Sequence, residues 1–237
     1  MIRCACLADA AGTADTTATA KVPVAAELQF QFDAPGHAAR VQTGSTPILR
    51  RGDEVRAAAL LEAGAPQVLL GEAVLSDADL PLRLAARFGL DRVGLFVPAR
   101  RMAVSWSFDT VSNADFRVVT PSLCEPGWEI LRADGSTTGI RVDWWLGEMK
   151  KRGIATALVQ VDILDDTDLN LCAGLVEDLG DGLWIASAGQ AEPVLADWVR
   201  YGKATRIALP PALFDRRAAL LGELSAPAAP MADMEEA

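Results

Sequence analysis

Solid apolar runs alternate with amphipathic segments from about residue 47 onward, and this alternation constrains the fold more than any other feature. The runs have the length of strands, as in QVLLGEAV, DRVGLFV and LWIASAG, and they carry few polar residues. Strands of this kind are typical of a parallel sheet that helices cover on both faces. The sequence therefore predicts an α/β fold.

The chain has 237 residues, a length at which a single α/β barrel is common. Six strand–helix alternations follow residue 46, whereas the preceding residues contain one clear strand pattern, ELQFQFD. We therefore predict one TIM-barrel-like (β/α)8 domain over residues 1–224 with an abbreviated N-terminal half. The Ala/Pro/acid-rich residues 225–237 are predicted to be disordered.

Composition excludes several classes of function. The net charge of −10 disfavours nucleic acid and anionic membrane surfaces as partners. No apolar window is long enough to span a bilayer, and the N-terminal residues make a poor signal peptide, so we expect a cytoplasmic protein. His37 is the only histidine, which excludes His-based triads and multi-His zinc sites. No cofactor is predicted.

Five stretches stand out along the chain: ELQFQFD, LLEAGAPQVLLGEAVLSDADL, DGSTTGIRVDWWLGEMKKRGIATALVQVDI, LWIASAGQ and RIALPPALFDRR. In order and spacing they resemble the (β/α)8 barrels of histidine biosynthesis, namely the phosphoribosylformimino carboxamide ribotide isomerase and the cyclase subunit of imidazole glycerol phosphate synthase. The similarity covers roughly residues 48–217, together with ELQFQFD. It implies a barrel enzyme that uses carboxylate acid–base chemistry at the C-terminal ends of its strands.

The resemblance implies catalytic aspartates after the first and fifth strands. Asp9 lies one residue from the first of these positions, which Ala8 occupies. For the fifth strand, the run GLFVPAR places Pro98 there, and proline has no group that transfers protons. The run AVSWSFDT instead places Asp109 there, with Asn113 nearby as a ligand-binding candidate. We favour Asp109; the alternative is a capping aspartate in a surface loop.

Two more carboxylates follow strand-like runs, Asp33 after ELQFQF and Asp162 after VQV, and are expected at the same rim. A buried Asp162 would have a raised pKa and could act as acid or base. The alternative is a helix cap or a salt bridge. The acids of DILDDTD could also bind a magnesium-like ion. Acid runs are more often solvated helix starts, so no metal site is predicted.

Arg50 and Arg51 follow the third strand-like run and could bind a carboxylate or a phosphate, with a solvated rim as the alternative. Ser187 and Gly189 lie where the resemblance implies a phosphate loop after the seventh strand. All four are predicted ligand-binding residues.

At other positions where the resemblance implies phosphate-binding residues, this sequence has residues that do not bind phosphate. Pro210 and Pro211 lack the N–H groups that bind phosphate, and Glu72 places a negative charge where the family has a small polar residue. The bis-phosphate substrate of the histidine pathway is therefore not expected.

These observations predict a divergent sugar-phosphate-type enzyme, which is isomerase- or lyase-like if it is active. Its substrate is expected to be a small molecule, and both a phosphorylated and an unphosphorylated substrate stay open. Relatives of the family are also associated with the biosynthesis of one-carbon carriers of the methanopterin or methylofuran type, and the resemblance extends that expectation to this chain. The alternative is a non-catalytic barrel that serves as a scaffold or partner-binding subunit.

A homodimer is also predicted. Few helices are expected in the first half, and parallel strands need cover on both faces. The predicted helices with Trp144, Trp145 and Trp198 could cover a partner. The alternative is a monomer in which the first 46 residues fill the gap.

Overall fold

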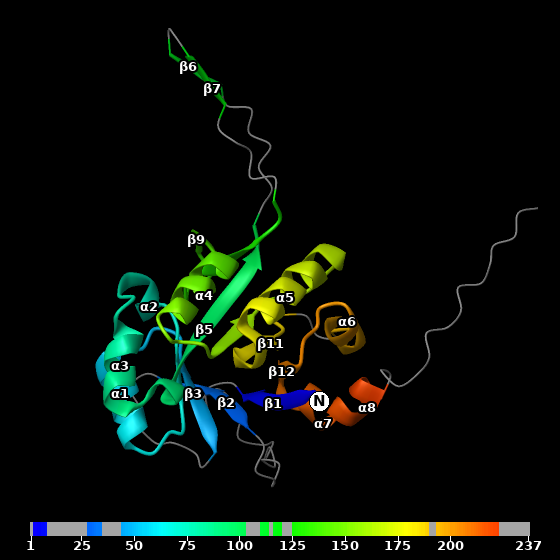
Figure 1. The fold of residues 1–237 in the computed structure, drawn as a ribbon. Helices are drawn as coiled ribbons and strands as arrows, with labels where there is room; N and C mark the ends of the chain where they lie inside the picture. The colour runs from blue at the N-terminus through cyan, green and yellow to red at the C-terminus, as the bar shows by residue number, and fades with distance from the viewer. Residues whose placement is uncertain are drawn as a thin grey trace, which may run out of the picture.

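Eight parallel strands close into a barrel in the computed structural model (Figure 1). The model describes residues 2–8, 28–34, 44–102, 125–189 and 193–222, and the backbone of 110–113 and 116–119. Around the barrel the strands are β1 (Arg3–Ala8), β2 (Gln29–Phe32), β3 (Ser45–Leu49), β4 (Val68–Leu70), β5 (Val93–Arg101), β10 (Ala157–Gln160), β11 (Leu183–Ala186) and β12 (Arg206–Leu209). Pairing of β10 with β5 and of β12 with β1 closes the ring. The predicted (β/α)8 fold is confirmed.

Helices follow or precede most strands from β3 onward. They are α1 (Glu54–Glu62), α2 (Ala73–Ser76), α3 (Leu80–Phe88), α4 (Val142–Lys151), α5 (Asp166–Leu179), α6 (Leu195–Arg200), α7 (Pro211–Asp215) and α8 (Arg217–Gly222), with short 3-10 turns η1 (Leu90–Arg92) and η2 (Gly180–Gly182). Between β1 and β3, the residues that the structure describes form no helix, in keeping with an abbreviated N-terminal half. None of the described helices is long and apolar enough to cross a membrane.

Strand alternation builds two hydrophobic layers. In β2, Phe30 and Phe32 point into the barrel, while Gln29 and Gln31, which alternate with them, are only partly buried. Phe30 packs edge-on against Trp184, with ring centroids 5.2 Å apart, and Phe32 packs similarly against Phe96. Side chains on the outward faces of the other strands pack against the helices in the larger core. The inside of the barrel is therefore a packed core, as is usual for this fold.

The fifth strand is longer than its neighbours. Its first part belongs to the barrel, where Pro98 pairs with Gln160 of β10. Its last residues pair antiparallel with β8 (Trp128–Leu131), which pairs with β9 (Thr137–Arg141). A separate antiparallel pair is formed by β6 (Thr110–Asn113) and β7 (Phe116–Val119). The β8–β9 hairpin therefore stands at the C-terminal end of the barrel.

Candidate functional site

A cavity of about 310 Å³ opens at the C-terminal ends of the barrel strands. Polar groups come from Arg50, Glu72, Arg132 and Gln160, and Phe96 and Pro98 contribute apolar surface. The turn of the β8–β9 hairpin forms another part of its wall. Active sites in barrels of this kind lie at this end, where the loops are not part of the packed core. This cavity, here called the mouth cavity, is the candidate active site.

Arg50 directly follows β3, and its guanidinium Cζ lies 4.0 Å from the centroid of the Phe32 ring. A cation held over an aromatic face is oriented without being neutralised. No carboxylate in the described part of the chain lies within ion-pair distance of Arg50. The guanidinium is therefore positioned to bind an anion at the mouth cavity.

Glu72 follows β4, and its backbone N–H donates to the Arg50 carbonyl at 2.9 Å. Its Oε2 accepts a hydrogen bond from the Ala133 N–H at 3.2 Å, and Arg51 Nε lies 3.7 Å from the same oxygen. The carboxylate thus joins β4 to the hairpin turn and also lines the cavity. Sequence reasoning treated Glu72 only as a charge that repels phosphate. Its place directly after the run QVLLG was the signal that could have identified it as a site carboxylate.

Asp162 ties the loop after β11 to the end of β10. Its Oδ1 accepts hydrogen bonds from Ser187 Oγ at 2.9 Å, the Ala188 N–H at 2.9 Å and the Gly189 N–H at 3.0 Å. Three donors on one oxygen favour the ionised carboxylate. The structure therefore brings Asp162, Ser187 and Gly189 together, while catalysis by Asp162 and ligand binding by Ser187 and Gly189 stay predictions. The loop N–H groups already hold an internal anion.

Asp33 directly follows β2 and binds Arg56 of α1 through both carboxylate oxygens, at 2.6 and 2.9 Å. The hydrogen bond with Asp33 raises the pKa of Arg56. Both residues line a second cavity of about 760 Å³, to which Arg50 and Arg51 also contribute. Two of the predicted ligand-binding residues and one predicted catalytic residue therefore share this end of the barrel. Catalysis by Asp33 stays a prediction.

Three predicted site residues lie outside what the structure describes. Asp9 and Asp109 fall in the gaps of the described ranges, and only the backbone of Asn113, at the end of β6, is described. The described fifth strand ends at Arg101, so Asp109 comes after the end of that strand. The shared-rim prediction for Asp109 and Asp162 stays a prediction.

The acidic segment after β10 is held by an arginine. Arg101 Nη1 donates to Asp165 at 2.7 Å, and Arg101 Nε donates to Asp168 at 2.9 Å. Asp168, only 1% exposed, also accepts from Trp128 Nε1 at 2.8 Å. Asp165 caps α5 by accepting from the Thr167 N–H. Two acids of DILDDTD, Asp165 and Asp168, therefore bind Arg101. The described residues contain no cluster of three or more side chains that could bind a metal ion.

Cys6 faces away from the barrel interior, in the outer core with the helices. Burial raises the pKa of its thiol. The Cys6 thiol therefore does not point into the barrel, because Ala5 and Leu7, which alternate with Cys6 along β1, belong to the core inside the barrel.

Fold and mouth cavity together define the class of this protein: a (β/α)8 barrel whose polar site lies at the C-terminal ends of its strands. The chain is 31% identical over 126 residues to the imidazole glycerol phosphate synthase subunit HisF of Trichormus variabilis. The match covers 51% of this chain and 42% of that protein. No family model matches the chain. The chain is thus similar to a histidine-biosynthesis barrel, as the sequence predicted, and diverges from it.

Proposed function

We propose that this chain is a barrel enzyme that transfers a proton on a small anionic substrate bound in the mouth cavity. Arg50 binds the anionic group, and Glu72 removes or returns the proton. One observation carries the proposal: this guanidinium and this carboxylate, from the ends of neighbouring strands β3 and β4, line a single small cavity. Proton transfer of this kind begins isomerase and lyase reactions alike.

The size and surroundings of the cavity restrict the substrate. About 310 Å³ is near the lower end of ligand sites, which run from about 300 to 1,000 Å³. The N–H groups of Ala188 and Gly189 already bind Asp162, which leaves them less available to a phosphate. These features support a substrate with one anionic group at Arg50 rather than a bis-phosphate.

Solvent-exchange measurements test the proposal. Dihydroxyacetone phosphate, ribose 5-phosphate and pyruvate are incubated with the protein in D₂O, and deuterium uptake is followed by NMR. We expect uptake with at least one probe, its loss in Glu72→Gln and a raised KM in Arg50→Met. The control Glu148→Gln changes a half-buried glutamate of α4 that pairs with Lys151, away from the mouth cavity. Equal uptake by Glu72→Gln would contradict the assignment of the base.

Two finer expectations rest on the family resemblance alone. The biosynthesis of a one-carbon carrier of the methanopterin or methylofuran type stays a prediction. So does the non-catalytic scaffold, which nothing in the described residues favours over an enzyme. Thermal shifts with the same three probes separate the enzyme from the scaffold, because a scaffold is stabilised by a protein partner only.

A further inference from the structure

A further polar cavity, of about 750 Å³, lies at the end of the barrel opposite the mouth cavity, where the strands begin. Its described lining contains three arginines, Arg3, Arg206 and Arg217, and no carboxylate. The polar side chains of Gln67 and Thr156 complete its wall. A basic cavity is unexpected in a chain with a net charge of −10. The mouth cavity, by contrast, contains Glu72.

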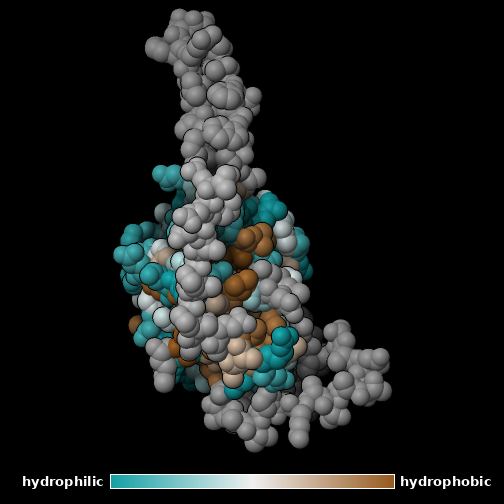
Figure 2. Space-filling view, turned by 90° about the vertical axis from the view of Figure 1, so that its right-hand side faces the viewer, coloured by the Kyte–Doolittle hydropathy of each residue, from teal (hydrophilic) through white to brown (hydrophobic). Residues whose placement is uncertain are grey.

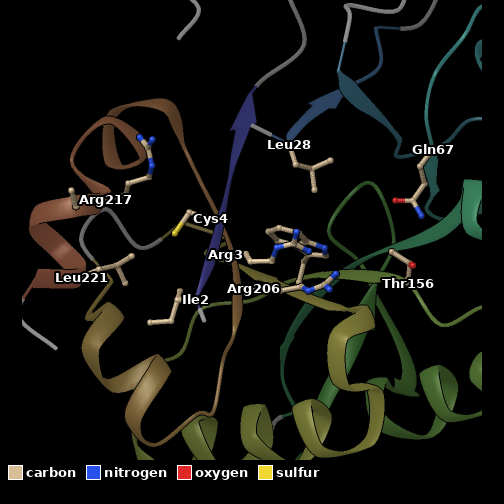
Figure 3. A pocket seen from close by; sticks show the side chains of 11 residues that line it. Ile2, Arg3, Cys4, Leu28, Gln67, Thr156, Arg206, Arg217 and Leu221 are labelled. Carbon is tan, nitrogen blue, oxygen red and sulfur yellow. The ribbon is translucent and has the colours of Figure 1, made fainter. Parts of the chain in front are cut away.

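Register places two of the arginines next to each other. Arg3 of β1 and Arg206 of β12 are direct partners in the parallel pairing, on strands about 4.8 Å apart. The residues two positions further along, Ala5 and Ala208, belong to the core inside the barrel, so both arginines face the interior side. Figure 3 shows Arg3 and Arg206 on one side of β1 with Leu28, Gln67 and Thr156, and Cys4 and Arg217 on the other.

These two positive charges are poorly compensated within the described residues. The one ion pair described for either side chain joins Arg206 to Asp181 at 3.8 Å, and the Asp181 side chain is 91% exposed. Exposed pairs of this kind contribute little, so Asp181 compensates the positive charges of Arg3 and Arg206 only weakly. Arg206 is held in place, because its Cζ lies 5.7 Å from the centroid of the Trp184 ring.

We infer that the Arg3–Arg206 cavity is a binding site for a small multivalent oxyanion, a phosphate ester or a polycarboxylate. Two guanidinium groups side by side offer the paired N–H donors that bind such oxyanions bidentately. A bound anion compensates the charges of both arginines. Gln67 Nε2 already donates to the Asp91 carbonyl at 2.9 Å, so its second N–H and the Thr156 hydroxyl are what remains for the other oxygens of the anion. The site is separate from the mouth cavity, since the packed aromatic core lies between them.

Isothermal titration calorimetry with pyrophosphate and with citrate at low ionic strength tests this site. The titrations use full-length Arg50→Met protein, which lacks the arginine that binds the anion in the proposed function. We expect saturable binding of at least one anion, weakened at least tenfold by adding Arg3→Met or Arg206→Met. If pyrophosphate binds and citrate does not, the ligand class is a phosphate ester. If citrate binds and pyrophosphate does not, the ligand class is a polycarboxylate. The control Arg87→Met removes an exposed arginine of α3 and should leave the affinity unchanged.

Three results would overturn the inference: no binding of either anion, equal binding after Arg3→Met and Arg206→Met, or equal weakening by Arg87→Met. Because Arg3 is exposed at a strand end, Arg3→Met is expected to fold, which far-UV circular dichroism checks. Anion binding that appears in the unsubstituted protein and disappears with Arg50→Met would place the anion at the mouth. That result supports the proposed function while rejecting this site.

Discussion

The Oδ1 atom of Asp162 lies 3.0 Å from the backbone nitrogen of Gly189, so a carboxylate from the end of β10 binds the loop that follows β11. The same oxygen binds the Ser187 hydroxyl and the Ala188 N–H. In a barrel that resembles phosphate-binding enzymes, this loop is held by the chain's own anion. Its conformation therefore depends on Asp162.

Replacing Asp162 by alanine should destabilise the protein. Hydrogen bonds to charged groups contribute about 1.5–3 kcal/mol each and are not additive, so we expect a loss of about 2–4 kcal/mol in the free energy of unfolding. Urea denaturation measures it. The control Asp166→Ala removes an exposed acid from the first turn of α5. Equal stability of the two variants would show that the Asp162 contacts contribute nothing.

Replacing Arg101 by methionine should destabilise the protein more. The substitution leaves the carboxylate of Asp168, 1% exposed, without its cation, and a broken buried pair costs about 3–5 kcal/mol. Adding Asp168→Asn should restore part of the loss, because the buried charge is then gone. Chemical denaturation of the single and double variants checks both expectations. Arg87→Met, which breaks an exposed pair with Glu62, should change stability by less than about 1 kcal/mol.

Stability should fall as the pH drops below about 4. The hydrogen bond from Arg101 lowers the pKa of Asp165 below its value in the unfolded chain, which is about 3.9. The unfolded state therefore binds the proton first, so the stabilisation is present above pH 4 and is lost as the pH falls toward the folded pKa. Urea midpoints measured from pH 6 to pH 2 should fall less steeply in Asp165→Asn. Parallel curves would contradict this contribution.

Two glycines should respond oppositely to alanine. A Cβ at Gly182 would lie 1.9 Å from the Ala155 carbonyl oxygen, whereas a Cβ at Gly174 in α5 would contact nothing. We expect Gly182→Ala to cost about 1–3 kcal/mol or more, because the backbone must move. Gly174→Ala should stabilise the helix by about 0.5–1 kcal/mol. Thermal unfolding of the two variants gives both signs in one experiment.

The homodimer stays a prediction, and fewer of the tryptophans on which it was based are exposed to a partner. Trp145 and Trp198 are 7% and 1% exposed and belong to the core, so only Trp144, 61% exposed on α4, is available to a partner. Figure 2 shows hydrophobic residues among hydrophilic ones on the face of the molecule that it presents. Light scattering should give twice the 25.1 kDa chain mass, and Trp144→Ser should lower it. A particle of the monomer mass at micromolar concentration would reject the dimer.

Much of the barrel could be predicted because strand and helix signals are local. The run QFQF places its phenylalanines on one face of the strand. The largely apolar runs ALVQ and LWIA indicate buried strands without any knowledge of the strands with which they pair. The antiparallel extension of β5 was missed, because the apolar run VGLFV ends at Pro98 and two arginines follow, so the sequence signal for a strand stops before the strand does.

The sequence by itself determined the order of strands and helices and the rim at which most of the polar residues collect. Only the tertiary structure decided the partner of each charge: Arg101 meets Asp165, 64 residues away, and Glu72 meets the Ala133 N–H, 61 residues away. The physical reason is that apolar periodicity is set by neighbours along the chain. Charge pairing depends on register and barrel closure, so in the sequence a catalytic carboxylate and one that binds an arginine look the same.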